Sequence, residues 1–419
     1  MKNIARNHYH WLVAGIIFLE MAIFGGIVNS FVVYTVPIVD DFNVTYGAFS
    51  LAGTPYGIIS FLSSIVVVVL FQRFGYRKIT VISLCVAAVG MVLISISQDL
   101  YLYGLGKSLF GAGFGSCFTT GAVVIIKNWF QRHQGLVLGI VTMASGIGGG
   151  LMSFILTQII VTTNWRMASL FSGALLIAIA IPYLLIRNHP KDLGLQKYGE
   201  GNQNQARKIK QRTDLWPGYS GKVILRRPLF YLTCLTVGLS CISVTITSST
   251  IVAFFQDAGY SATAASSYNT TIMLTLAVVK LAAGWFSDRY GAKPLTFLCV
   301  ACAAIGHLML TTISSPSISY ISAGIFSVGI CITSLCIPLM TVPLFGYRGS
   351  LEVNGYLLSL PSFALIVATP LANFSRDYFE SYTEAYFISF IVDLATIILF
   401  AVIFAMGKRD QKKYLESNN

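Results

Sequence analysis

The sequence predicts an all-α membrane protein of twelve transmembrane helices, arranged as two related halves of six. Three observations support this prediction: a shortage of charged residues, a series of long apolar runs, and a one-sided distribution of Lys and Arg. Of the 419 residues, 55% are hydrophobic and 11% are charged, whereas soluble domains carry about 25% charged residues. Because a soluble chain of this length needs a wetted surface, the composition indicates a surface that faces lipid.

Twelve apolar runs are long enough to cross a bilayer, which takes about 20 residues of helix. Six lie near 11–37, 46–71, 79–97, 101–126, 135–162 and 166–187, and six more near 228–255, 263–287, 294–313, 318–343, 352–374 and 384–406. We therefore expect an N-terminal six-helix half (1–187), a polar linker (188–227) and a C-terminal half with a short basic tail (228–419).

Most Lys and Arg residues fall in alternate loops between these runs. With the N-terminus in the cytoplasm, the cytoplasmic segments collect nearly all of them, and the opposite loops keep only Arg166 and Arg376 beside several acids. Since Lys and Arg favour cytoplasmic loops, we expect both termini to be cytoplasmic. The net charge of +12 is thus a topology signal, and we expect no nucleic-acid partner.

The two halves carry related residues at one constant spacing. Asp41 and Asp257 are 216 positions apart. The same spacing links Thr45 to Ser261, Ser50 to Ser266, Thr54 to Thr270, Arg73 to Arg289, Gly75 to Gly291 and Arg77 to Lys293. A constant spacing over such a stretch indicates an internal repeat.

One loop in each half carries the same pattern of glycines and basic residues. The second-half copy consists of Gly284, Asp288, Arg289, Gly291 and Lys293, and the first-half copy keeps Arg73, Gly75 and Arg77. Both resemble the signature loop of the major facilitator superfamily of transporters. The resemblance implies a charge-locked contact that opens and closes during transport. In the first copy Val68 and Gln72 replace the signature's Gly and Asp, so half of this lock is missing there.

Other motifs extend the resemblance over nearly the whole chain. Lys107-x-x-x-Gly111-x-Gly113 is similar to a second superfamily motif, whose first position is usually Arg. Trp129–Leu136, Asn164–Arg166, Pro190–Leu195 and Leu225–Phe230 resemble segments of the monocarboxylate-porter and oxalate/formate-antiporter branch. The resemblance implies transport by alternating access, with a substrate site near the membrane midplane between the six-helix repeats.

The pocket of the oxalate-exchanging members is only partly present. Lys280 stands where they carry an Arg, and Ser362 stands where they carry a second cation. Tyr34 matches one of their pocket tyrosines, and Phe118 is a partial substitute for other aromatic residues. Because one fixed cation suits a monoanion better than a dianion, we expect a monocarboxylate rather than oxalate.

Lys280 is the main candidate for binding the substrate. It lies seven residues before the end of the run at 263–287, which is about 10 Å of helix. A charge at the bilayer centre costs at least about 2.5–3.5 kcal/mol, so it needs a partner or a role. We interpret Lys280 as the receptor for a carboxylate; the alternative is a lysine whose stem reaches towards the inner surface.

Four more ionisable residues lie inside predicted spans. We expect Glu20 to be the counter-ion of Lys107, either as a structural pair or as a proton-binding pair. Asp393 and His307 are expected to have structural roles in helix packing, as most buried polar groups do.

Three asparagines are the neutral candidates for substrate contact, namely Asn29, Asn269 and Asn354. Asn269 and Lys280 are eleven residues apart, about three helical turns, so both side chains can face one cavity.

The run at 135–162 is rich in glycine. The glycines are Gly135, Gly139, Gly146, Gly148, Gly149 and Gly150. Because they lie inside an apolar span, they predict close helix packing rather than a phosphate-binding loop, which needs a preceding strand and a Lys-Ser/Thr ending.

These observations lead us to expect a secondary transporter for a small organic anion, working by proton symport or by anion exchange. We expect a monomer in the plasma membrane, without cofactor or metal. One alternative is efflux of an amphipathic drug or metabolite. A non-transporting membrane sensor or an enzyme is the alternative of another class. Against it, the sequence lacks HExxH, GxSxG and Walker motifs and any soluble signalling domain.

Overall fold

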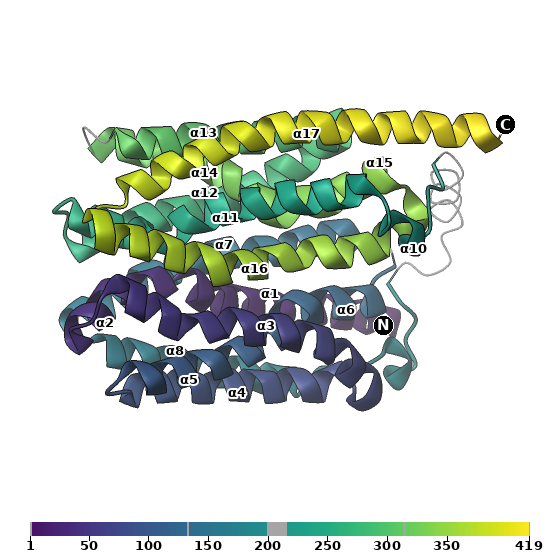
Figure 1. Cartoon of the computed structure of the whole chain (residues 1–419). Helices are drawn as coiled ribbons and strands as arrows, with labels where there is room; N and C mark the ends of the chain where they lie inside the picture. The colour runs from purple at the N-terminus through teal and green to yellow at the C-terminus, as the bar shows by residue number, and fades with distance from the viewer. Residues whose placement is uncertain (1, 132–133, 199–215, 313–315, 419) are drawn as a thin grey trace. The chain divides into compact units, whose positions relative to one another are not determined.

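The structure is a computed structural model that describes residues 2–131, 134–198, 216–312 and 316–418. The described residues are helical almost throughout (Figure 1). The first part of the chain forms α1 (Lys2–Asn29), η1 (Phe31–Tyr34), α2 (Thr35–Phe42), α3 (Tyr46–Phe74), α4 (Tyr76–Ile96), α5 (Leu100–Gly113), η2 (Phe114–Thr119), α6 (Thr120–Trp129), α7 (Gln134–Thr162), α8 (Trp165–Tyr183) and η3 (Pro190–Leu193). The second part forms α10 (Gly221–Ile224), α11 (Pro228–Asp257), α12 (Ala262–Tyr290), α13 (Ala292–Thr311), α14 (Pro316–Cys331), η4 (Ile332–Cys336), α15 (Ile337–Phe345), α16 (Tyr347–Phe379) and α17 (Thr383–Asn418).

The prediction of an all-helical, multi-pass chain is confirmed. Within the described ranges, 11 helices are long and apolar enough to cross a membrane. The predicted run at 101–126, which comprises α5, η2 and most of α6, is not among them. Twelve spans and cytoplasmic termini therefore remain predictions.

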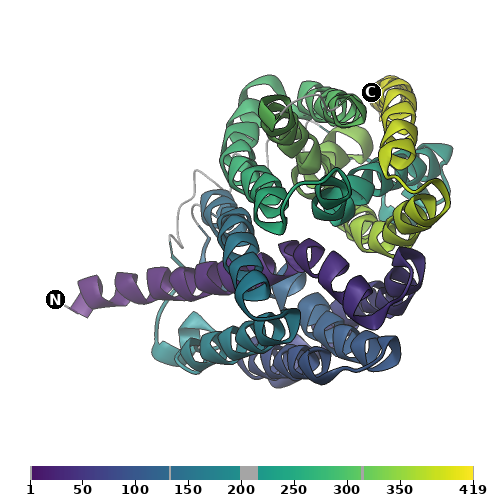
Figure 2. The same cartoon turned by 90° about the vertical axis from the view of Figure 1, so that its left-hand side faces the viewer.

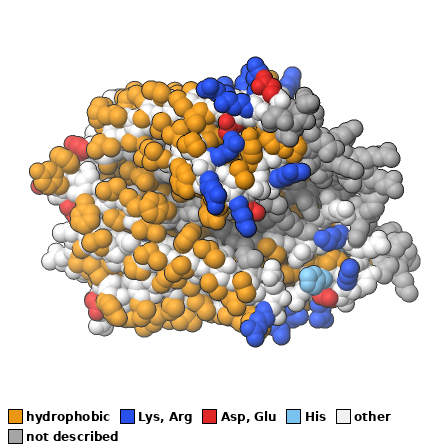
Figure 3. All heavy atoms as spheres, turned by 45° about the vertical axis from the view of Figure 1, so that its right-hand side comes forward, with side chains coloured by type: hydrophobic (Ala, Val, Ile, Leu, Met, Phe, Trp, Pro, Cys, Tyr) orange, Lys and Arg blue, Asp and Glu red, His pale blue; other side chains and the backbone are white. Residues whose placement is uncertain are grey.

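Apolar side chains cover much of the face shown in Figure 3. Val278 on α12 and Ile398 on α17 are 67% and 66% exposed. Lys and Arg side chains gather towards one end of the face shown in Figure 3. Large exposed aliphatic side chains in the middle of long helices are expected where lipid, not water, surrounds the protein.

The chain divides into two compact units. Unit 1 comprises Met1–Gly201, Ser248–Val278 and Thr369–Tyr382. In this unit α4 packs against α5 and α8, α3 packs against α5, and α1 packs against α7. Phe24, Phe110 and Trp129 are among its fully buried side chains.

Unit 2 comprises Asn202–Thr247, Val279–Ala368 and Thr383–Asn419. Its core is formed where α13 packs against α14 and α17, and Phe326 and Tyr386 are fully buried there. Figure 2 shows the helices from one end. The predicted domain boundaries at 187 and 228 remain predictions, and residues 199–215 of the predicted linker lie outside the described residues.

The glycines of α7 bring neighbouring helices close to its backbone. A Cβ atom at Gly148 would overlap the backbone oxygen of Ala22 on α1, and one at Gly146 would lie 2.9 Å from the backbone oxygen of Met273 on α12. The close packing predicted for this run is therefore confirmed at Gly146 and Gly148 but not at Gly139, where nothing lies within 4 Å of an added Cβ. Small residues let helix backbones approach in membranes, where van der Waals contact drives association.

Residues paired by the internal repeat have the same local roles. Thr45 and Ser261 each accept a hydrogen bond from the backbone N–H three residues later, at the start of α3 and α12. Gly75 joins α3 to α4 with φ +80°, and Gly291 joins α12 to α13 with φ +91°. Only glycine adopts such a backbone without strain, which explains why both loops carry it.

The glycine packing of α7 can be tested by adding one methyl group. We expect Gly148→Ala to lower the free energy of unfolding by about 1–3 kcal/mol, because overpacking forces the backbones of α1 and α7 apart. Gly139→Ala on the same helix is the matched control, since nothing lies within 4 Å of its added Cβ. Denaturant unfolding in detergent micelles measures both; equal effects would contradict the packing described.

Candidate functional site

Lys280 lies on α12 inside a candidate membrane span, Ala262–Ser287. Its side chain is partly buried. The Cys331 thiol, at the end of α14 where the π-helical segment η4 begins, is within electrostatic range of the ammonium group. The structure thus places Lys280 within unit 2, beside a π-helical break, and π-helical segments are frequent at functional sites.

Asn29 and Asn269 lie together in unit 1. Asn269 Nδ2 donates to the backbone oxygen of Asn29 at 3.2 Å and to Ser153 Oγ at 3.1 Å. Asn29 Nδ2 donates to the backbone oxygen of Ser145 at 3.1 Å. Asn269 Oδ1 is buried and has no hydrogen-bond partner in the described part of the chain. This cluster joins α1, α7 and α12 and leaves one buried acceptor for a further donor.

The other neutral candidates lie in separate surroundings. Tyr34 in η1 is 1% exposed, and its hydroxyl lies 3.4 Å from Ser172 Oγ on α8. Phe118 belongs to η2 and stacks on Phe114, with ring centroids 4.9 Å apart. Asn354 lies on α16, and within the described residues its buried Oδ1 has no partner.

Four aromatic rings surround the ammonium group of Lys107 on α5. Its Nζ lies 5.4 Å from the centroid of Phe31, 5.5 Å from those of Phe49 and Tyr103, and 6.0 Å from that of Tyr56. A cation within about 6 Å of an aromatic ring face is attracted by the ring quadrupole, and more strongly where water is absent. None of the ion pairs formed by the described residues involves Lys107.

The predicted pairing of Glu20 with Lys107 is wrong. Glu20 is fully buried on α1, and its Oε2 accepts a hydrogen bond from the Tyr183 hydroxyl on α8. The expectation assumed that two opposite charges in neighbouring spans form an ion pair. In the structure an aromatic cage solvates the lysine and a phenol solvates the acid, so neither needs the other's charge.

His307 and Asp393 form a buried pair that the sequence analysis did not predict. His307 Nδ1 on α13 lies 2.7 Å from Asp393 Oδ2 on α17, and the side chains are 0% and 1% exposed. The His307 ring also packs against Phe326. The pair ties two helices of unit 2 together, and the structural roles expected for both residues remain predictions.

The signature loops are short connections between long helices. Arg73 lies over the ring of Phe74, and Arg289 lies over those of Trp285 and Tyr290. Gly284 has open space around its missing Cβ. Lys293 is exposed at the start of α13. The Asp288 side chain, Arg132 and His133 lie outside the described residues, so the gating role of the loops remains a proposal.

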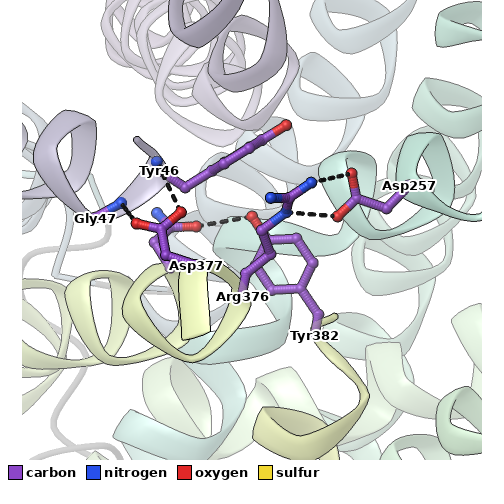
Figure 4. Close-up of polar contacts among 7 residues, drawn as sticks. Tyr46, Gly47, Asp257, Arg376, Asp377 and Tyr382 are labelled. Atoms are coloured by element: carbon purple, nitrogen blue, oxygen red, sulfur yellow. Dashed lines mark hydrogen bonds and ion pairs between the residues drawn. The ribbon is translucent and has the colours of Figure 1, made fainter. Parts of the chain in front are cut away.

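A polar network in unit 1 joins the start of α3 to the ends of α11 and α16 (Figure 4). The Asp377 carboxylate accepts hydrogen bonds from the backbone N–H groups of Tyr46 at 3.1 Å and Gly47 at 2.7 Å. Arg376 Nε donates to Asp257 at 3.1 Å, and its guanidinium lies 4.4 Å from the Tyr46 ring centroid.

Sequence reasoning placed Asp257, Arg376 and Asp377 on one side of the membrane but did not connect them. Asp257 and Arg376 are 119 residues apart, and no local pattern links them. The available signal was that Arg376 is one of two basic residues among the acids of those loops.

Comparison with known proteins identifies relatives over most of the chain. The profile of the Major Facilitator Superfamily matches residues 11–345. An uncharacterized MFS-type transporter, YcxA of Bacillus subtilis, is 24% identical over 268 residues, which cover 63% of this chain and 62% of that protein. The fujikurins efflux protein of Gibberella fujikuroi is 22% identical, over 32% of this chain and 30% of that protein. Monocarboxylate transporter 14 of Homo sapiens is 29% identical, over 29% of this chain and 24% of that protein.

The matches to these curated relatives span less than two thirds of their lengths. Among solved structures, a mutant of the nucleoside transporter NupG superposes with a TM-score of 0.75 at 10% identity, over 94% of this chain and 99% of that chain. At this identity the likeness concerns the fold alone.

The Asp377 contact predicts the hydrogen exchange of two amides. Hydrogen bonds to charged groups contribute about 1.5–3 kcal/mol. We therefore expect Asp377→Ala to speed exchange at Tyr46 and Gly47 about tenfold or more, as followed by mass spectrometry. Asp99→Ala is the matched control, because Asp99 accepts from the backbone N–H of Leu102 and should affect only the start of α5. Unchanged exchange at Tyr46 and Gly47 in the first variant would refute the contact.

The buried pair of unit 2 can be measured by a double-mutant cycle. We expect His307→Leu to cost about 3–5 kcal/mol of unfolding free energy, because it leaves a buried carboxylate unpaired. His307→Leu/Asp393→Leu should cost less than the two single changes together, since contacting residues couple by about 0.5–3 kcal/mol. Strictly additive losses in denaturant unfolding would show that the two side chains do not interact.

Proposed function

Because the chain belongs to the Major Facilitator Superfamily, we propose that it moves a small organic anion, a monocarboxylate, across a membrane by alternating access. Coupling is by proton symport or by anion exchange. We propose the plasma membrane as its location, with both termini in the cytoplasm and a monomer as the working unit. The chain is a multi-pass membrane transporter and not an enzyme.

The observation that supports an anion is the distribution of charge inside the spans. The buried acids Glu20 and Asp393 are hydrogen-bonded to Tyr183 and His307. The Lys107 ammonium, by contrast, is surrounded by aromatic rings and takes part in none of the ion pairs of the described residues. Fixed positive charge in a low-dielectric interior favours a negatively charged guest.

Lys280 is the residue that we propose binds the substrate carboxylate. Its position, seven residues before the end of the span Ala262–Ser287, supports this proposal, because secondary transporters bind their substrates near the membrane midplane. An ammonium offers three donors as a compact point charge, which suits one carboxylate. Substrate contacts by Tyr34, Asn29, Asn269, Asn354 and Phe118 are part of the same proposal.

The likeness to monocarboxylate transporter 14 supports this substrate class. The likeness to the fujikurins efflux protein supports the second candidate, efflux of an amphipathic metabolite. Each of the two buried acids, Glu20 and Asp393, has one carboxylate oxygen hydrogen-bonded to a protein side chain. Lys107, by contrast, takes part in none of the ion pairs of the described residues, and on this ground we favour the anion.

Movement of this kind requires one end of the molecule to open while the other closes. We propose that the network of Tyr46, Asp257, Arg376 and Asp377 holds one end of unit 1 shut. The signature loops around Gly75 and Gly291, with Arg73, Arg77, Arg289 and Lys293, are proposed to move in the same cycle. Glu20 is the proposed proton-binding residue, because its Oε1 has no partner within the described residues.

Uptake into proteoliposomes tests the substrate and Lys280 together. With labelled lactate, pyruvate, acetate and formate, we expect transport of at least one, and a fall of about tenfold or more in Lys280→Met, because a charge-assisted contact of about 1.5–3 kcal/mol is lost. Lys412→Met is the matched control, since Lys412 is exposed on the tail of α17. Imposed pH gradients distinguish symport from exchange.

Two results would overturn the proposal. If none of the four anions is transported, the substrate class is wrong. If an anion is transported equally well by Lys280→Met and by the native chain, Lys280 has no part in binding. Transport of a lipophilic cation instead would establish the efflux alternative.

A further inference from the structure

A cavity with two arginines lies where α4 begins and α8 has ended, apart from every residue proposed to contact the transported substrate. Its volume is about 220 Å³, and it is lined by Arg77, Arg187, Asn188, Asp192 and Leu193. One liquid water occupies about 30 Å³, so the cavity has room for a phosphate or carboxylate group and several waters. All five residues belong to unit 1.

Hydrogen bonds fix the backbone around this cavity. Arg77 N donates to Asn188 Oδ1 at 3.1 Å, and Arg187 N donates to the Tyr9 hydroxyl at 3.1 Å. The Tyr76 hydroxyl donates to the backbone oxygen of Arg187. A Cβ at Gly75 would overlap the Asn188 side chain, so glycine is needed for this docking. The cavity is therefore a built feature of the fold.

The cavity carries more positive than negative charge. Neither Arg77 nor Arg187 takes part in an ion pair within the part of the chain that the structure describes. The one acid in the lining, Asp192, accepts the backbone N–H of His189 at 2.9 Å. Guanidinium groups match the geometry of phosphate oxygens and bind them with paired hydrogen bonds.

Exposed apolar residues precede Arg187 along the chain. Arg187 lies four residues beyond the end of α8 at Tyr183, and Ile181 and Leu185, six and two residues before it, are each 63% exposed. Arg77 is the second residue of α4, whose span starts at Tyr76. Both arginines therefore lie close to the ends of membrane-spanning segments, and exposed aliphatic side chains precede Arg187. This combination fits an amphiphile, with a phosphate at headgroup level and hydrocarbon against α8.

We propose that the cavity lined by Arg77 and Arg187 binds the phosphate of an anionic phospholipid, whose acyl chain lies on Ile181 and Leu185. Basic pockets at the cytoplasmic ends of membrane helices recognise lipid headgroups in this way. A zwitterionic lipid carries the same phosphate with a compensating cation and binds more weakly. Free inorganic phosphate offers the charge without the chain, and it cannot use the apolar surface.

Native mass spectrometry of the detergent-purified full chain tests the proposal. Probes are phosphatidylglycerol, phosphatidylcholine and inorganic phosphate. We expect one phosphatidylglycerol per chain to be retained, bound about tenfold or more tighter than phosphatidylcholine, with no competition by millimolar phosphate. Arg77→Gln/Arg187→Gln should weaken phosphatidylglycerol binding about tenfold or more. Lys222→Gln/Arg226→Gln removes the same charge elsewhere and should leave binding unchanged.

Three results of these binding measurements would overturn the proposal. The first is equal binding of phosphatidylglycerol and phosphatidylcholine, and the second is equal weakening of phosphatidylglycerol binding by the two double variants. The third is displacement of the lipid by inorganic phosphate, which would make the cavity a free-phosphate site. Arg77→Lys/Arg187→Lys serves if the Gln variant does not fold. It keeps the charge but loses the paired hydrogen bonds, and native-like lipid binding by it would also contradict the assignment. Because the readout is lipid binding, the outcome is independent of the transport assay.

Discussion

The cost of placing charge in a low-dielectric interior governs this structure. A charged side chain at the bilayer centre costs at least about 2.5–3.5 kcal/mol, and every intramembrane charge described above is accommodated in a definite way. Glu20 accepts a hydrogen bond from Tyr183, and His307 pairs with Asp393. Lys107 sits among aromatic rings, and Lys280 lies beside a thiol. Glu20 and Asp393 each have a hydrogen-bonding protein partner, whereas Lys107 is surrounded by aromatic rings, which is why an anion is the guest that we propose.

Backbone constraints place these side chains. Glycines on α7 let α1 and α12 approach closely, and this approach brings Asn29 and Asn269 together. Single glycines with positive φ turn α3 into α4 and α12 into α13. The π-helical segments η2 and η4 contain or adjoin Phe118 and Cys331. Several of the candidate residues thus lie where the regular helix is interrupted or where helices pack unusually close.

The sequence was most informative where physics acts along the chain. Hydropathy located the spans, and the constant spacing between Thr45 and Ser261 or Gly75 and Gly291 predicted positions with equal local roles. Sequence analysis failed where the two interacting residues come from distant segments of the chain. The Glu20–Lys107 pair was inferred from charge alone, but Tyr183 is 163 residues from Glu20 and carries no charge to reveal it. The helical extension of α17 to Asn418 was missed because its last turns are polar, so hydropathy stops before the helix does.

The sign of the substrate's charge is the central claim, and a ligand screen on the purified protein measures it directly. A ligand that binds only the folded state stabilises it, by about 2.7 kcal/mol at a ligand concentration of a hundred times Kd. This stabilisation raises the unfolding temperature. Small carboxylates should raise the unfolding temperature of the native chain, and lipophilic cations should not. Stabilisation by lipophilic cations, with no response to any carboxylate, would contradict the account.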